Sequence, residues 1–465
     1  MKLKSVCYSL GILLLISCSK ETGVNAPPPS RPAAIRLSEA ELERLPLLSD
    51  NHRRASDQVL ALAEAFMSNQ TDTKSEARLR ICDSIPVESS LTKGADLNAA
   101  PIYVVSRGDG NGFVLVAGDS RVEPVWGVVE RGDYVEGENP GFDIVLAQMK
   151  EDIAQAIAAK ESLRGDSTYN ALLDKLALAS ASASKSDRPQ RAPVDPPPVI
   201  DYPENYDRVE IVEKNPYYEI EYEYGPLLKT RWGQWSPYNF ELRNTHPGCP
   251  VGCVATAVAQ IMAYHKHPDY MAATGHTYLW DLMAVDRDDS WHMDAMYSVG
   301  YLMVDLGLPQ YLDMLYGPGG SEANGAKDLG RTFNAFGYAW SPLSDYDGSK
   351  VLNEVKQNRP VYVRGDSGSG SNGHAWVADG VLYQHRYVTY WMQFYWFDQL
   401  VSEIECGTAK SSSGSYVHHN FGWDGLQDGW YASLEPYNCL HVKPGEMNPS
   451  DYRKNMKVIT GIKPK

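Results

Sequence analysis

Hydrophobic residues recur along the first third of the chain with two spacings, which predict helices and strands. A period of three to four residues predicts helical structure over 37–69, interrupted near Pro46, and over 142–163. Short β-branched and aromatic runs predict three strands, at 102–105, 113–116 and 125–129. The polar, glycine-rich segment 106–112 predicts a hairpin turn between the first two strands. We therefore expect a small α+β domain here.

The last half of the chain has a different pattern, in which helices precede strands. Apolar residues at i, i+4, i+7 and i+8 from Val254 predict a buried helix between Gly252 and Pro268. A second helix is predicted over 291–306, with its methionines in the core. Runs rich in Val, Tyr and Trp predict strands at 361–364, 375–382 and 429–432. This order predicts an α+β fold with an antiparallel sheet packed against a helical half.

Aromatic residues are dense between positions 382 and 415. We expect this segment to form a hairpin that packs on the sheet, because aromatic side chains favour half-buried strands. Whether the segment also recognises large substrates is left open by the sequence.

Composition and charge limit the choice of partners. The chain has 465 residues, enough for two domains, and 43% of them are hydrophobic. With 59 acidic and 43 basic residues, the net charge of −16 argues against nucleic acid or an anionic membrane surface as the main partner. Seven cysteines are too few for a disulfide-rich scaffold. The disulfide state of four of them does not follow from the sequence: Cys82, Cys249, Cys406 and Cys439.

The N-terminus has the pattern of a targeting signal. A basic start is followed by the apolar run 10–16, which is too short to span a bilayer. The ending Leu-Ile-Ser-Cys resembles a bacterial lipobox, so we expect residues 1–17 to be a signal peptide and Cys18 to be lipidated. Residues 18–36 would then form a tether. The alternative is an ordinary cleaved signal peptide, and both interpretations imply export.

The composition changes again over 176–215. Alternating Ala and Ser give way to a charged, proline-rich stretch that cannot bury enough apolar surface to fold. We interpret it as a linker between a domain at 37–175 and a domain at 216–465. Exposed linkers are sites of proteolysis, so we predict a maturation cleavage between Ser184 and Lys214. The alternative is a permanent hinge.

Cys253 stands at the N-terminus of the predicted buried helix. The helix dipole and the unpaired N–H groups there favour an anion, which lowers the pKa of a thiol and makes it a better nucleophile. Two other interpretations are a structural buried cysteine and a disulfide or metal pair with Cys249. Zinc would need a second ligand pair at suitable spacing, and none follows.

The segments 252–257, 259–262 and 264–265 resemble the nucleophile segment of the streptopain-like secreted cysteine peptidases of the papain clan. The resemblance implies a papain-like peptidase domain at 216–465. The hairpin at 112–119 more weakly resembles the family's propeptide, which implies that 37–175 is an inhibitory propeptide domain.

A thiol nucleophile needs a base to accept its proton. His265 lies on the same helix about 18 Å from Cys253, so it is too distant. His374 follows a glycine-rich loop and begins a predicted strand, and segments 358–363 and 373–375 resemble the family's base segment. The resemblance therefore implies that His374 is the base. His418 and His419 are rival candidates that we interpret as strand residues beside the site.

The stretch 418–425 resembles the family motif His-x-Asn-Trp-Gly-Trp-x-Gly. The resemblance implies that Asn420 accepts the N–H of the imidazole and that Trp423 shields this pair from water. Phe421 replaces the usual tryptophan. Gln234, in a segment that resembles Gln-Gly-x-Pro-Tyr-Asn, is implied to bind the oxyanion with the N–H of Cys253.

The resemblance also implies two further substrate-binding residues, Ser321 in the Gly/Ser-rich loop 316–321 and Gly373 beside the base. No metal and no organic cofactor is required. The expected function is an exported cysteine endopeptidase made as a zymogen, lipid-anchored at the bacterial cell envelope, with a catalytic domain released by cleavage. Its partners would be protein or peptide substrates and its own propeptide. The alternatives are a papain-fold amidase or acyltransferase acting on cell-wall or conjugated amides, and a catalytically idle surface-binding lipoprotein.

Overall fold

The computed structural model describes residues 37–49, 51–68, 79–87, 99–184, 208–284, 292–324, 329–366, 373–397, 399–433 and 456–465. Cys18 and the predicted signal peptide and tether lie outside these residues. Within the described ranges, no helix has both the length and the apolar character needed to cross a membrane. We refer to 37–184 as the N-terminal unit and to 208–465 as the C-terminal unit.

The N-terminal unit contains helices and a small antiparallel sheet. Its elements are α1 (Glu39–Leu42), η1 (Leu45–Leu48), α2 (Ser56–Met67), β1 (Arg80–Ile85), β2 (Ile102–Ser106), β3 (Phe113–Ala117), β4 (Val125–Val129), α3 (Pro140–Glu161) and α4 (Ser167–Ser184). The predicted strands are therefore confirmed with nearly the expected bounds, while β1 and α4 were not predicted.

The C-terminal unit places most of its helices before its long strands. Its helical elements are η2 (Phe240–Asn244), α5 (Cys253–His265), α6 (Trp280–Met283), α7 (Met293–Leu306), α8 (Leu329–Ala335) and α9 (Gly348–Val355). Its longer strands are β5 (Arg208–Tyr224), β12 (Val361–Gly365), β13 (His374–Trp396), β14 (Gln399–Asn420), β15 (Gly429–Ala432) and β16 (Lys457–Ile459). Two-residue strands complete it: β6 (Tyr270–Met271), β7 (His276–Thr277), β8 (Met314–Leu315), β9 (Glu322–Ala323), β10 (Tyr338–Ala339), β11 (Ser344–Asp345) and β17 (Lys463–Pro464).

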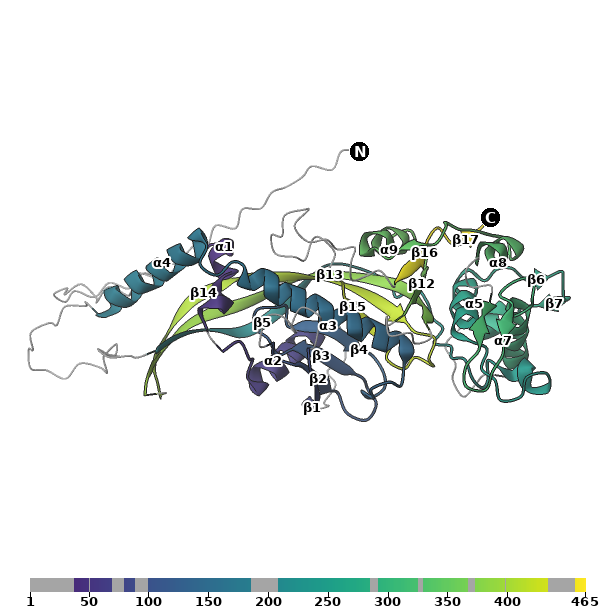
Figure 1. The fold of residues 1–465 in the computed structure, drawn as a ribbon, viewed down its shortest axis with the longest axis horizontal. Helices are drawn as coiled ribbons and strands as arrows, with labels where there is room; N and C mark the ends of the chain where they lie inside the picture. The colour runs from purple at the N-terminus through teal and green to yellow at the C-terminus, as the bar shows by residue number, and fades with distance from the viewer. Residues whose placement is uncertain are drawn as a thin grey trace, which may run out of the picture.

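One continuous sheet joins the two units. In the described residues its strand order is β1-β2-β3-β4-β15-β14-β13-β12-β16-β11, with β5 paired to β13. The junction is the antiparallel pair β4·β15, in which Val129 faces Gly429 and Gly127 faces Tyr431. The N-terminal unit is therefore an extension of the sheet that carries the candidate site, as Figure 1 shows.

Helix α3 covers the junction between the units. Asn139 caps its start, because the Asn139 side chain accepts hydrogen bonds from the N–H groups of Gly141 and Phe142. Its apolar residues share one hydrophobic cluster with the C-terminal unit, in which Phe142 and Ile153 are buried together with Trp376 and Tyr431. Folding therefore buries α3 against both parts of the sheet.

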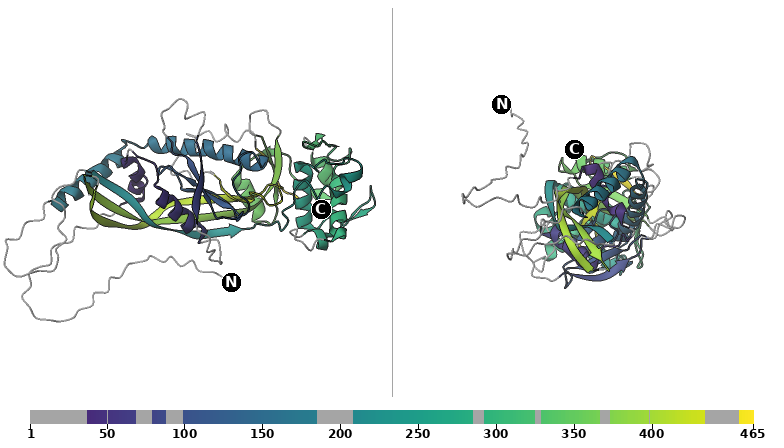
Figure 2. Two further views of the ribbon diagram at one scale, coloured as in Figure 1. Left: turned by 90° about the horizontal axis from the view of Figure 1, so that it is seen from below. Right: turned by 90° about the vertical axis from the view of Figure 1, so that its left-hand side faces the viewer.

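Helix α5 is the centre of the helical half of the C-terminal unit. Ten consecutive residues from Val254 to Ala263 are buried. The eight apolar residues among them belong to a separate cluster that also contains residues of α7, such as Val299 and Met303. Figures 1 and 2 show this helical half at one end of the molecule, next to the ends of β12 and β13.

The aromatic segment forms an arm instead of packing on the sheet. Strands β13 and β14 remain paired far beyond the sheet, and β5 pairs along the other edge of β13. Stacked rings line this three-stranded arm, including Tyr217 on Tyr387 at a centroid distance of 5.1 Å. Figure 1 shows the arm projecting away from α5. One face of the arm packs on the N-terminal unit, where Val388 and Tyr390 are buried with Leu172 of α4, and cross-strand aromatic pairs add to its stability.

Both ends of the predicted linker have regular structure. Helix α4 continues to Ser184, because alanine-rich sequence favours a helix even where serine alternates with it. Strand β5 starts at Arg208, before the expected domain start at 216, since alternating apolar and charged residues suit a strand with one buried face. Residues 185–207, where most of the predicted cleavage window falls, lie outside the described residues.

Candidate active site

Cys253 is the first residue of α5, as the sequence predicts. Gly252 precedes it with φ +92°, a left-handed conformation that favours glycine. A Cβ at Gly252 would lie 2.5 Å from the Met314 Cε atom and 2.9 Å from the Ser321 carbonyl oxygen. The backbone can therefore turn into α5 between these neighbours only with glycine at position 252.

His374 is the first residue of β13 and pairs with Gly365 of β12. Its ring is almost fully buried and lies close enough to the Cys253 thiol for each group to shift the pKa of the other. Trp376 lies parallel to the ring with centroids 6.2 Å apart, and Trp423 packs edge-on at 5.7 Å. The strand and two indoles thus fix an imidazole beside a thiol.

The two groups perturb each other's ionisation. Burial is the largest single influence and raises the pKa of Cys253, but the adjacent His374 ring and the backbone N–H groups of Ala375 and Val254 together outweigh it, so the thiol pKa is lowered from 9.0. Burial lowers the pKa of His374, but the Cys253 sulfur outweighs it and raises the imidazole pKa above 6.5. Opposite shifts of this kind favour a thiolate–imidazolium pair, the reactive form of a cysteine nucleophile.

The group that holds the other side of the imidazole differs from the expectation. His374 Nε2 lies 2.8 Å from the backbone carbonyl oxygen of Phe421, which leaves Nδ1 for Cys253. The Asn420 side chain, expected at this place, does not make this bond. Its Oδ1 instead accepts hydrogen bonds from Gln260 Nε2 at 2.9 Å and from the Gly422 N–H at 3.2 Å. The physical reason is that both ends of the Asn420 amide already have partners: Oδ1 accepts the two bonds above, and Nδ2 donates to the Thr230 carbonyl oxygen.

Gln234 is buried and lies close to the nucleophile along the backbone. Its carbonyl oxygen accepts the N–H of Val251 at 2.9 Å, two residues before Cys253. Trp235, which takes the place of a glycine in the family motif, is 43% exposed. The extra side chain is therefore accommodated by pointing towards solvent.

The predicted substrate-binding residues surround the pair. Ser321 Oγ donates to the Pro250 carbonyl oxygen at 2.6 Å, which connects its loop to the turn before Cys253. Trp423 contacts the His374 ring, as described above. Gly373 lies next to His374, and a Cβ there would come within 2.8 Å of the Gly365 carbonyl oxygen.

The two rival histidines have other partners. His418 donates from Nδ1 to Asp379 at 2.6 Å and lies 3.4 Å from Glu130 of the N-terminal unit. Burial lowers the pKa of His418, but the two carboxylates outweigh it and raise the pKa to about 10. His419 accepts the indole N–H of Trp376 at 3.0 Å, and burial lowers its pKa to about 3. Both are buried strand residues beside the site.

The N-terminal unit reaches the candidate base directly. A Cβ at Gly141, in the first turn of α3, would lie 2.7 Å from His374 Cδ2 and 2.5 Å from Phe421 Cδ1. Asn139 Nδ2 donates to the Leu426 carbonyl oxygen at 3.0 Å and holds this turn in place. The start of α3 therefore covers the imidazole.

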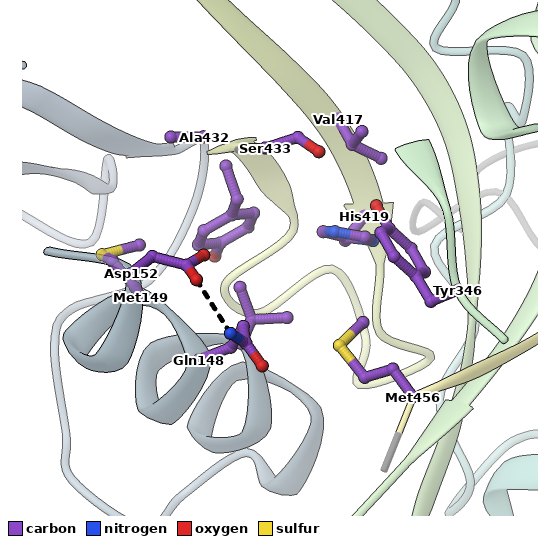
Figure 3. A pocket seen from close by; sticks show the side chains of 11 residues that line it. Gln148, Met149, Asp152, Tyr346, Val417, His419, Ala432, Ser433 and Met456 are labelled. Atoms are coloured by element: carbon purple, nitrogen blue, oxygen red, sulfur yellow. Dashed lines mark hydrogen bonds between the residues drawn. The ribbon is translucent and has the colours of Figure 1, made fainter. Parts of the chain in front are cut away.

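Further along α3, a cavity of about 30 Å³ remains between the helix and the sheet. Figure 3 shows Gln148, Met149 and Asp152 of α3 on one side and His419 and Tyr346 on the other, with the Gln148–Asp152 hydrogen bond dashed. This space is little larger than one water molecule needs, so the helix packs closely on the sheet. Its lining includes neither Cys253 nor His374.

Three thiols in the described residues are free. Cys82 is exposed, Cys249 is buried and Cys253 is half-buried. Cys249 therefore does not form a disulfide with Cys253 here, although they are only four residues apart. The sulfur of Cys253 is free to react.

Three functional contacts were missed from the sequence. The Phe421 carbonyl group has no side-chain signal, because any residue provides a backbone oxygen. Gly141 lies in an ordinary helix start, so its contact with His374 depends on the tertiary fold. Gln260 could have been found, since a polar residue in an otherwise apolar helix is informative.

Two protein-family models match this chain. The Peptidase C10 family matches residues 232–431, and the Spi protease inhibitor family matches residues 52–153. The first match contains Cys253, His374 and Asn420. The second contains Gly141, the glycine that covers His374.

Individual proteins match over most of the chain. Streptopain of Streptococcus pyogenes serotype M28 is 22% identical over 447 residues, covering 89% of this chain and 92% of streptopain. Thiol protease/hemagglutinin PrtT of Porphyromonas gingivalis is 25% identical over 413 residues, covering 80% of this chain and 38% of PrtT. Among solved structures, a prointerpain A fragment of Prevotella intermedia matches with a TM-score of 0.45 and 20% identity, covering 82% of this chain and 99% of the fragment.

Proposed function

This chain belongs to the Peptidase C10 family and is a cysteine peptidase made as a zymogen with its own inhibitory propeptide, and from this premise we propose how its residues act. Cys253 is the nucleophile, and His374 is general base and then general acid. The thiolate attacks the scissile carbonyl carbon, and the imidazolium gives its proton to the leaving amine. Water, activated by the neutral imidazole, then hydrolyses the thioester. The Cys253 thiol at the start of α5, beside a buried His374 ring whose Nε2 is held by the Phe421 carbonyl oxygen, is the observation that carries this proposal.

The remaining site residues orient or bind. The Phe421 carbonyl oxygen accepts the His374 Nε2–H and holds the imidazole tautomer that leaves Nδ1 for the sulfur. Asn420, the residue before Phe421, holds the Phe421 carbonyl group in place through its own side-chain hydrogen bonds. Gln234 and the N–H of Cys253 stabilise the oxyanion. Ser321, Gly373 and Trp423 border the bound peptide.

The propeptide inhibits by covering the base. Helix α3 places Gly141 on the His374 ring, where a substrate would need access. The domain assignment follows: a propeptide at 37–175 and a peptidase domain at 216–465, joined by a segment that is cut between Ser184 and Lys214. Because α4 reaches Ser184 and β5 starts at Arg208, the bonds between these two residues are the favoured sites.

We also propose export and lipidation at Cys18, with 1–17 removed as a signal peptide and 18–36 as the tether. The basic n-region, the short apolar run and the Leu-Ile-Ser-Cys ending support this. The protein is then anchored at the bacterial cell envelope, and cleavage of the linker frees the peptidase domain from the anchor.

The test compares the wild type with Cys253→Ala and His374→Ala on casein, each with and without a thiol-alkylating inhibitor. We expect casein loss and self-trimming by the wild type alone, and a loss of about 10³-fold or more in either variant. Equal trimming and digestion by Cys253→Ala would contradict the assignment. Labelling cells with a radioactive fatty acid tests the anchor, and Cys18→Ser should abolish incorporation.

A further inference from the structure

Gln260 is a fully buried polar residue in the apolar helix α5. It lies seven residues after Cys253, so it is about 10 Å further along the axis and within about 20° of the same helix face. Groups that hydrogen-bond to the Gln260 amide are therefore held in place relative to Cys253 through helix α5.

The Gln260 amide joins two other segments of the site. Its Oε1 accepts hydrogen bonds from Thr230 Oγ1 and from the Trp232 N–H, each at 3.0 Å. Its Nε2 donates to Asn420 Oδ1 at 2.9 Å. Asn420 Nδ2 in turn donates to the Thr230 carbonyl oxygen at 2.8 Å, which closes a ring of buried hydrogen bonds.

Each bonded segment continues into a candidate catalytic group. Trp232 is two residues before Gln234, the proposed oxyanion ligand. Asn420 directly precedes Phe421, whose carbonyl oxygen holds His374 Nε2. We propose that Gln260 is a positioning residue that fixes the imidazole and the oxyanion ligand relative to the sulfur on its own helix. This inference rests on the proposed roles of Cys253, His374 and Gln234.

An amide satisfies this arrangement at every pH, whereas an ionised carboxylate does not. One end of the side chain must accept two hydrogen bonds, and the other end must donate to an oxygen that already accepts from the Gly422 N–H. A carboxylate at position 260 could still accept, but it would present an oxygen to Asn420 Oδ1 without a proton between them. Asn420 and Phe421 would then shift, and displacements of about 1 Å in an active site can cost about 10²-fold in rate.

The test uses Gln260→Glu in the full chain, with Gln384→Glu as the matched control. Gln384 is also buried, but lies on β13 about 30 Å beyond His374. Each zymogen is converted with resin-bound wild-type enzyme, which is then removed. Peptide hydrolysis by the converted enzyme gives kcat and KM. On the uncleaved chain, the rate at which Cys253 is alkylated is followed at several pH values by the mass of the peptide that contains it.

For Gln260→Glu we expect kcat to fall about 100-fold while KM changes less than about threefold. Alkylation of Cys253 at pH 6 should slow about tenfold, because a loosened imidazolium stabilises the thiolate less. Gln384→Glu should keep wild-type values for both. Unchanged kcat and alkylation in Gln260→Glu, or an equal loss in the control, would overturn the proposal.

A second variant guards against misfolding. Gln260→Met keeps the length without a charge, and we expect the same fall in kcat and in alkylation at pH 6. If both variants fold poorly while Cys253 in the folded fraction keeps the wild-type alkylation profile, Gln260 is only structural and the proposal fails. A wild type without peptide hydrolysis would refute the proposed function instead, and the alkylation comparison would still decide the role of Gln260.

Discussion

Gly141 of the propeptide and His374 of the peptidase domain are in direct contact: a Cβ at position 141 would lie 2.7 Å from the imidazole Cδ2 atom. Real Cβ atoms do not approach so closely, so any larger residue must push α3 away from the base. Inhibition therefore depends on the absence of a side chain at one position.

The first prediction concerns this contact. Gly141→Val should weaken propeptide binding by about 1–3 kcal/mol, because overpacking forces backbone shifts, and should raise the activity of the uncleaved zymogen about 5- to 100-fold. The measurement is the initial rate of peptide hydrolysis before any linker cleavage appears on a gel. Ala147→Val places the same side chain on the exposed side of α3 and should leave the rate unchanged. Equal rates for the two variants would count against the contact.

The second prediction concerns pH. The lowered pKa of Cys253 and the raised pKa of His374 both favour the thiolate–imidazolium pair over the neutral thiol and imidazole. We expect a bell-shaped profile of kcat/KM whose acid limb reports ionisation of the thiol and whose alkaline limb reports loss of the imidazolium proton. The check is the alkylation of Cys253 against pH. In His374→Ala the apparent thiol pKa should rise towards 9.0, and an unshifted value would exclude the pair.

The third prediction concerns Glu130, a propeptide carboxylate that lies 3.4 Å from His418 and 3.5 Å from Arg231. Burial raises the pKa of Glu130, but His418, Arg231 and the more distant Arg107 outweigh it and lower the pKa below 4.5. This attraction is present above pH 4.5 and is lost as the pH falls through the lowered value.

The Glu130→Gln zymogen should therefore activate about two- to fivefold faster than the wild type at pH 7, since a partly exposed pair contributes little. The difference between the two activation rates should disappear on acidification below about pH 4.5, because Glu130 of the wild type then loses its charge. Activation time courses, started by a fixed amount of mature enzyme, measure both effects. A constant ratio of the two rates down to pH 3.5 would disprove the role of Glu130.

The fourth prediction concerns the route of maturation. Arg208 pairs with Tyr395, which is 21 residues along β13 from His374 and so about 70 Å away. Leu172 of α4 packs with Val388 and Tyr390 of the arm, and Figure 1 shows α4 leading further from α5. Even when fully extended, the connection from Ser184 to Arg208 keeps each of its residues within about 40 Å of either Ser184 or Arg208. It cannot reach the active site of its own molecule.

Maturation should therefore be intermolecular. The half-time of zymogen conversion should lengthen about tenfold on tenfold dilution, and added mature enzyme should cut the Cys253→Ala zymogen in the same region. Inserting about 40 Gly/Ser residues between Ser184 and Arg208 should restore a concentration-independent component, because the loop could then reach its own site. A half-time that does not depend on concentration in the unmodified chain would show cleavage within one molecule.

The local sequence pattern was sufficient to predict many of the helices and strands of the C-terminal unit. The spacing of Val254, Val258 and Ile261 predicted α5, and the glycine-rich entry to a strand made His374 a candidate base, which the family resemblance then favoured over the other histidines. Both depend on nearest neighbours in the sequence. The opposed pKa shifts were partly predictable as well, since the start of a helix already favours a thiolate.

Long-range pairing could not be predicted. Residues of β5 pair with residues of β13 that lie at least 157 positions later (381 − 224), and the alternating pattern of β5 does not say which strand it joins. The role of Asn420 failed for a related reason: its amide is claimed by Gln260 and Thr230, and only the packed fold brings these residues together. The propeptide contact at Gly141 likewise depends on how α3 crosses the joined sheet.

The pairing of β4 with β15 has a consequence for the mature enzyme. When the propeptide leaves, β15 changes from an interior strand into a border of the sheet, with backbone N–H and C=O groups of Gly429–Ala432 newly open to water. An exposed edge strand can pair with a strand of another chain, which leads to self-association. Because β15 has only four residues, it offers few backbone groups for such pairing. The same brevity lets the peptidase lose its partner without leaving a long adhesive edge behind.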